Sequence, residues 1–168
     1  MINSTIFNTL KNTKHQNVSQ KCKEASLSPV QYKPIELPNE NRNYCIVDKN
    51  KVDFYINQRE NALPQLENLL KNTNDEKEVT ETLYILDQMI DNGVKGVGEM
   101  YPTLAKFNDT KSPNVQTFLA GIYRKTQVPD AFGPLVTMLI QNSINPPKTP
   151  QYFNPNEEIG GAILSYLA

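Results

Sequence analysis

The acidic side chains of the central segment are the groups whose type and spacing could perform catalysis. Asp87 and Asp91 lie one helical turn apart, and Glu78 and Glu81 precede them. Paired carboxylates can act as general acid and base, but only when burial separates their pKa values. All four positions lie off the apolar stripe of the segment, so the pattern favours a solvated helix face.

A glycine-rich stretch, Gly-Val-Lys-Gly-Val-Gly at residues 93–98, is the loop best suited to holding a phosphate. Glycines leave backbone amides free to bind an anion. However, no Gly-Lys-Ser/Thr triplet is present and no strand is predicted before the stretch. Since Asn92-Gly93 is also typical of a helix C-terminus, the sequence favours a cap and a tight turn, with anion binding as the minor alternative.

Nucleophiles and metal ligands do not form a recognisable set. Ser143 and Ser165 have no histidine in the expected folded region, because His15 is the single histidine of the chain. Cys22 and Cys45 lack a CxxC spacing, and a reduced, intracellular pair is favoured over a disulfide. We therefore expect no catalytic residue, no metal site and no cofactor.

Charge is distributed unevenly along the 168 residues, whose net charge is −1. Residues 1–43 contain six Lys/Arg and three Asp/Glu, whereas residues 44–168 contain 11 and 15. A negative domain is a poor match for phosphate backbones, so we expect no nucleic-acid partner. The sequence has no secretory leader and no apolar run of membrane-spanning length, so we expect a cytoplasmic protein without a membrane partner.

Residues 1–43, rich in Asn, Lys, Gln and Ser, are predicted to be a disordered tail, and residues 44–168 the folded domain. At the start of this domain, two readings compete. Residues 44–56 could form two short strands around Asp48–Lys51, or a helix from Val52. The helix is favoured, because its apolar spacing resembles that of the segments that follow.

Three segments share one apolar spacing and begin 36 and 44 residues apart. They are Val79-x-x-Thr82-Leu83-x-x-Leu86, Val115-x-x-Phe118-Leu119-x-x-Ile122 and Ile159-x-x-Ala162-Ile163-x-x-Tyr166. Between them lie apolar segments that each contain a proline. Repetition at such a period is typical of helical arrays. We expect helices of about eleven to seventeen residues joined by short turns.

This pattern resembles HEAT or armadillo-type repeats over residues 58–168. Ala62–Leu70 followed by Val79–Leu86 is similar to the junction of two HEAT units, and Ala105–Asp109 followed by Val115–Ile122 repeats that junction. The resemblance implies an all-α fold, a short α-solenoid of stacked antiparallel helix pairs. A generic helical bundle is the alternative.

The stripes predict a core that contains Leu83, Leu104, Leu119 and Leu139. The last stripe reaches the end of the sequence without a polar cap. We therefore expect either that the chain is a fragment of a longer array or that its last helix, around Ile159 to Leu167, self-associates.

A solenoid of this kind implies a non-enzymatic scaffold that binds a protein partner. The predicted contact residues are polar positions on the second helix of each pair and one methionine expected to be exposed: Gln65, Asn68, Lys71, Thr103, Lys106, Met138 and Gln141. A HEAT-like enzyme, similar to DNA glycosylases or bilin lyases, is an alternative that the absence of tryptophan disfavours. A purely structural part of a longer array is another.

Overall fold

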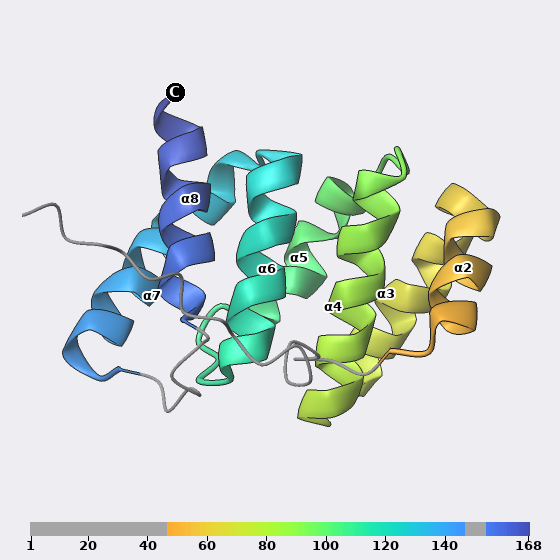
Figure 1. The fold of residues 1–168 in the computed structure, drawn as a ribbon, viewed down its shortest axis with the longest axis horizontal. Helices are drawn as coiled ribbons and strands as arrows, with labels where there is room; N and C mark the ends of the chain where they lie inside the picture. The colour runs from red at the N-terminus through yellow and green to blue at the C-terminus, as the bar shows by residue number, and fades with distance from the viewer. Residues whose placement is uncertain (1–46, 147–153) are drawn as a thin grey trace, which may run out of the picture. The chain divides into compact units, whose positions relative to one another are not determined.

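The computed structural model describes residues 47–146 and 154–168, and all regular structure in these ranges is helical (Figure 1). This confirms the predicted all-α class. The α-helices are α2 (Lys49–Gln58), α3 (Leu63–Asn72), α4 (Glu76–Asp91), α5 (Tyr101–Leu104), α6 (Pro113–Thr126), α7 (Phe132–Ile144) and α8 (Pro155–Leu167). The 3₁₀ turns are Arg59–Ala62, Val97–Met100, Ala105–Phe107 and Pro129–Ala131. The predicted tail, both cysteines and the histidine lie outside the described residues.

The even-numbered helices pack side by side: α4 contacts α2 and α6, and α6 contacts α8 (Figure 1). The odd-numbered helices pack beside them, with α3 against α4 and α5, and α7 against α8. Residues that are separated along the chain by about one helix pair therefore lie close together in space. Among the described residues, none of the helices is long and apolar enough to cross a membrane.

Helix boundaries follow local signals in the sequence. The α6 helix begins where expected, because the Ser112 side chain accepts a hydrogen bond from the Val115 amide at 3.4 Å and Pro113 occupies the first turn. The α4 helix ends at Asn92, and Gly93 follows with a φ of 78°. These two boundaries confirm the predicted N-cap and C-cap.

Replacement of Ser112 by Ala should lower the free energy of unfolding by about 1 kcal/mol, because the cap of α6 is lost. The Ser112 hydroxyl also donates to Glu76 at 2.6 Å, which links α6 to the start of α4. Urea titration of the variant measures the effect, and Ser143→Ala at an exposed position of α7 is the control. Equal stability of the two variants would contradict a capping role.

The ambiguous segment before residue 58 is helical in its described part. The α2 helix begins at Lys49, earlier than the predicted start at Val52. The reason is local: the Asp48 side chain accepts a hydrogen bond from the Asn50 amide at 2.9 Å and so caps the helix. The hairpin alternative is wrong for the described residues 47–56.

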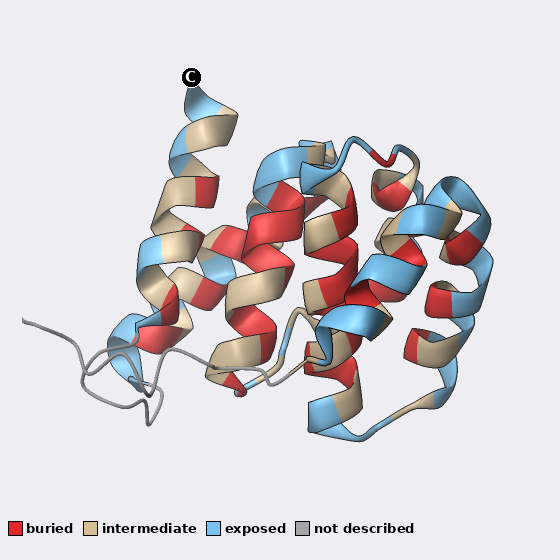
Figure 2. Ribbon diagram, turned by 45° about the vertical axis from the view of Figure 1, so that its right-hand side comes forward, coloured by how far each residue is buried: buried red, intermediate tan, exposed pale blue. Residues whose placement is uncertain are grey.

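The core lies where the helices face one another (Figure 2). Leu83, Leu104 and Leu119 are no more than 1% exposed, which confirms three of the four predicted core leucines. Leu139 is only partly buried and packs against the edge of the core.

The difference at Leu139 arises from the rotation of α7. Its most buried residues are Leu135, Met138 and Asn142, which lie on a neighbouring stripe. The Asn142 side chain donates a hydrogen bond to that of Gln116 at 2.8 Å, and both residues are buried. Because an unpaired buried amide is costly, this pair determines which side of α7 faces inward.

The segment from Val97 to Phe107 does not form the expected long helix. It consists of two 3₁₀ turns that flank the single turn of α5. Pro102, in the first turn of α5, has no backbone amide to donate, so a helix cannot continue regularly through this point.

Candidate functional site

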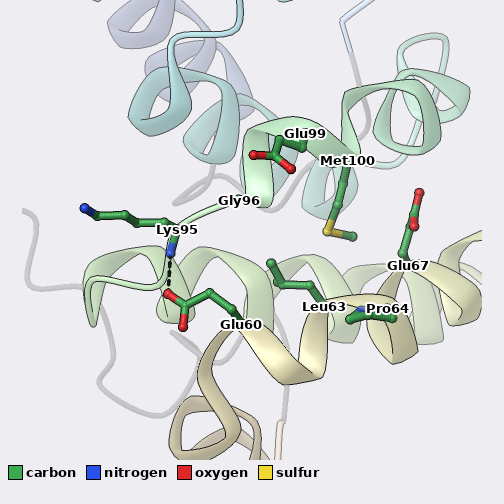
Figure 3. A pocket seen from close by; sticks show the side chains of 8 residues that line it. All are labelled: Glu60, Leu63, Pro64, Glu67, Lys95, Gly96, Glu99 and Met100. Atoms are coloured by element: carbon green, nitrogen blue, oxygen red, sulfur yellow. Dashed lines mark hydrogen bonds between the residues drawn. The ribbon is translucent and has the colours of Figure 1, made fainter.

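A hollow of about 530 Å³ separates α3 from the chain that enters the 3₁₀ turn Val97–Met100 (Figure 3). We call it the acidic hollow. Three glutamates line it, Glu60, Glu67 and Glu99, together with three apolar residues, Leu63, Pro64 and Met100. Lys95 and Gly96 complete the lining.

Apolar side chains form the floor of the acidic hollow. Leu63 and Met100 point toward one another from opposite walls (Figure 3). Gly96 allows the walls to approach, because its φ is 88° and a Cβ there would lie 3.3 Å from Leu63 Cδ1. The positive φ therefore favours glycine at this position, and a Cβ there would also crowd Leu63.

Glu60 is held in place by the glycine-rich stretch. Its carboxylate accepts a hydrogen bond from the Lys95 amide at 3.0 Å (Figure 3), and this bond lowers the pKa of Glu60. The preceding residue, Arg59, adopts a φ of 54°, unusual for a non-glycine residue, and donates a hydrogen bond to the Gly93 carbonyl at 3.2 Å. This strained turn places Glu60 against the loop.

Glu67 is fixed from α3 and α5 together. It accepts hydrogen bonds from Lys71, at 2.8 Å, and from Thr103, at 2.7 Å, and these bonds lower its pKa. Glu99 is exposed, and its carboxylate has no hydrogen-bond or ion-pair partner among the described residues. The acidic hollow therefore contains two carboxylates of lowered pKa, those of Glu60 and Glu67. The third carboxylate, that of Glu99, has no partner among the described residues.

Anion binding by residues 93–98 is the minor alternative from the sequence, and one backbone amide of this stretch is bound to a carboxylate of the chain itself. The Lys95 amide binds the Glu60 carboxylate, while Gly93 caps α4. The capping interpretation is thus confirmed for Gly93. The ammonium group of Lys95 extends away from the acidic hollow (Figure 3).

The predicted contact row separates into two groups. Lys71 and Thr103 both bind the Glu67 carboxylate, and Lys106 Nζ donates to the Lys71 carbonyl at 3.1 Å. Thr103 is buried by this arrangement rather than exposed. Gln65 and Asn68 are exposed on the same helix as Lys71.

The two residues predicted on α7 do not join this group. Met138 is 2% exposed, so its assignment to an exposed contact surface is wrong. The Gln141 side chain accepts a hydrogen bond from Lys111 Nζ at 2.9 Å. Both differences follow from the rotation of α7 described above.

The expectation of a solvated face at Asp87 is also wrong. Asp87 Oδ1 lies 2.7 Å from Lys125 Nζ, which also binds Asp91 at 2.8 Å, so the lysine links α6 to α4. Burial raises the pKa of Asp87, and the hydrogen bond from Lys125 opposes part of that rise. Burial alone would lower the pKa of Lys125, but its hydrogen bonds to Asp87 and Asp91 together raise it. The geometry is that of a structural link between helices.

Glu60 and Glu99 were not identified as site residues from the sequence. The carboxylates of the acidic hollow come from three separate elements, so no local pattern in the sequence brings them together. One signal is present in retrospect: Glu60 and Glu99 each stand shortly before a helix that has proline in its first turn, at Pro64 and Pro102. Aligning those prolines places both glutamates at the entrance of their helices.

No group of three or more His, Cys, Asp or Glu side chains in residues 47–146 and 154–168 is arranged to hold a metal ion. Comparison of the chain with protein-family models, with curated proteins and with solved structures finds no match.

Proposed function

We propose that this chain is a non-enzymatic binding module, a short HEAT-like α-solenoid that holds a protein partner at the acidic hollow. The observation that carries the proposal is the combination of three glutamates with an apolar floor. Lys and Arg side chains match such a site, because their aliphatic stems pack on apolar surface while their charged heads meet carboxylates. The partner is therefore a segment that presents a Lys or Arg side chain.

The electrostatic environment supports a basic partner. The lowered pKa values of Glu60 and Glu67 keep both side chains ionised at neutral pH. The described residues contain ten Lys/Arg and fifteen Asp/Glu, which gives a net charge of −5. Such a field steers a basic segment toward the surface and repels a phosphate backbone.

The helix arrangement supports the repeat assignment. Cross-helix hydrogen bonds recur at similar sequence separations: Thr103 to Glu67 spans 36 residues, Lys106 to Lys71 spans 35 and Lys125 to Asp87 spans 38. Contacts between equivalent positions of successive units are expected of stacked repeats.

Selection of displayed random peptides on the immobilised full chain tests the proposed function. Enriched peptides should share a Lys or Arg, and Glu99→Lys should weaken their binding about tenfold or more. Asp53→Lys, an equal charge change at an exposed position of α2, is the matched control and should change affinity less than about twofold. Peptides enriched without a basic residue would refute the proposal.

Substitution of Lys71 tests whether the partner binds at the acidic hollow or at the row of contact residues predicted from the sequence. Lys71 Nζ lies 2.8 Å from Glu67 Oε1 in the structure and would compete with a basic partner for this carboxylate, so Lys71→Ala should strengthen binding of the selected basic peptides. If the lysines themselves contacted the partner, charge reversal at Lys71 and Lys106 would weaken binding instead. Isothermal titration of both variants separates the two surfaces.

A further inference from the structure

A second hollow adjoins the acidic hollow on the other side of residues 95–99. Its volume is about 480 Å³, and we call it the apolar hollow. Lys95, Gly96 and Glu99 line both hollows, so the two lie on either side of one short segment. The apolar residues of the second are Ile90, Val94, Val97, Val128 and Pro129.

Two glycines lie in the segment between the hollows. A Cβ at Gly96 would lie 3.3 Å from Leu63 Cδ1, and one at Gly98 would lie 3.2 Å from Val128 Cγ2. The segment therefore packs closely against Leu63 of the acidic hollow and against Val128 of the apolar hollow. The two hollows are separated only by this short segment, so one partner segment can contact both.

Two polar side chains at the apolar hollow are already paired within the chain. Lys125 contributes its stem, while its ammonium binds Asp87 and Asp91. Thr126 Oγ1 donates to the Ile122 carbonyl at 2.8 Å. Away from Glu99 and Lys95, which lie at the border with the acidic hollow, the lining offers a guest mainly apolar contact.

We propose that the apolar hollow receives a Val, Leu or Ile side chain of the same partner segment whose Lys or Arg occupies the acidic hollow. This proposal rests on the proposed function and specifies the partner as an extended, two-anchor peptide. Alternate side chains of an extended segment point to the same side. The apolar residue is therefore expected two or four positions from the basic one.

The same peptide selection tests this pairing through a second feature of the enriched sequences. Peptides should contain a Lys or Arg together with an aliphatic residue at one of these fixed spacings. A basic residue without a fixed aliphatic neighbour would overturn the two-anchor proposal and leave the proposed function standing. An aliphatic residue without a basic one, or no enrichment, would overturn both.

A double-mutant cycle then assigns the aliphatic anchor to the apolar hollow. Val128→Thr keeps the side-chain shape and should weaken the selected peptide about three- to tenfold. For the peptide whose aliphatic residue is replaced by Ser, the Val128→Thr variant and the wild-type chain should have the same affinity. Val136→Thr on α7, outside the hollow, is the matched control and should change neither affinity.

Independent effects of the two changes would place the anchor elsewhere and overturn the proposal. If Val128→Thr fails to fold, as judged by circular dichroism, Ile90→Thr replaces it in the cycle, since Ile90 lines the opposite wall. The Ser-substituted peptide must also bind the wild-type chain about three- to tenfold more weakly. Equal binding of the two peptides would refute the second anchor without any variant.

Discussion

Replacement of Leu119 by Ala should lower the free energy of unfolding by about 2–5 kcal/mol. Leu119 is 0% exposed on α6, the helix that contacts both α4 and α8. A cavity here removes contacts from the centre of the packed helices, and the loss is a large share of the stability of a domain of this size. Urea denaturation monitored by circular dichroism measures the effect.

Two leucines provide the comparison. Leu164 is 68% exposed on α8, so Leu164→Ala should change stability by less than about 0.5 kcal/mol. Leu139→Ala should lie between the two, because Leu139 is partly buried. A Leu119→Ala variant as stable as Leu164→Ala would contradict the packing of α6.

Replacement of Lys125 by Met should cost about 1–3 kcal/mol at pH 7, because it leaves the Asp87 carboxylate buried without its partner. The Asp87 side chain is 13% exposed, so water can satisfy it only in part. The double variant Lys125→Met, Asp87→Asn removes the charge and should recover part of the loss. Lys77→Met, at an exposed position of α4, is the control.

The loss at Lys125 should also depend on pH. Burial already raises the folded-state pKa of Asp87 above its ordinary value of 3.8, and removal of Lys125 raises it further. A raised folded-state pKa contributes stability that is present below the unfolded-state pKa and is lost as pH rises through the folded-state pKa. The deficit of Lys125→Met relative to wild type should therefore be smallest below about pH 4 and largest near pH 7. A deficit that grows on acidification would contradict this assignment.

Sequence periodicity was sufficient for helices such as α4 and α6, because each signal is local. The Ser112 and Asn92 boundaries depend on a few neighbouring residues, and the core positions of α4 and α6 follow from one stripe each. The orientation of α7 could not be predicted in this way. It depends on the buried pair of Asn142 and Gln116, whose members lie 26 residues apart.

The same distinction explains the candidate site. Asp87 lies off its apolar stripe and is buried because α6 packs against it, with Gly121 and Lys125 of that helix next to its carboxylate. The acidic hollow exists because Glu60, Glu67 and Glu99 converge from different elements around a loop that no periodicity describes. The resemblance to HEAT repeats led to the prediction of a partner surface on the second helix of each pair, and of the two lysines in that prediction Lys71 binds Glu67. It could not indicate the sign of the charge at that surface.

The short reach of the cross-helix hydrogen bonds has a consequence for how the chain folds. Among the described residues, the side-chain hydrogen bond with the largest separation in sequence joins the Tyr166 hydroxyl to the Tyr123 carbonyl, 43 residues apart. Loop closure over such separations costs less entropy than joining the two ends of the domain would, and proteins dominated by near-neighbour contacts fold quickly. Folding can therefore begin at the junction of α4 and α6 and extend outward one helix pair at a time, without waiting for the two ends of the domain to meet.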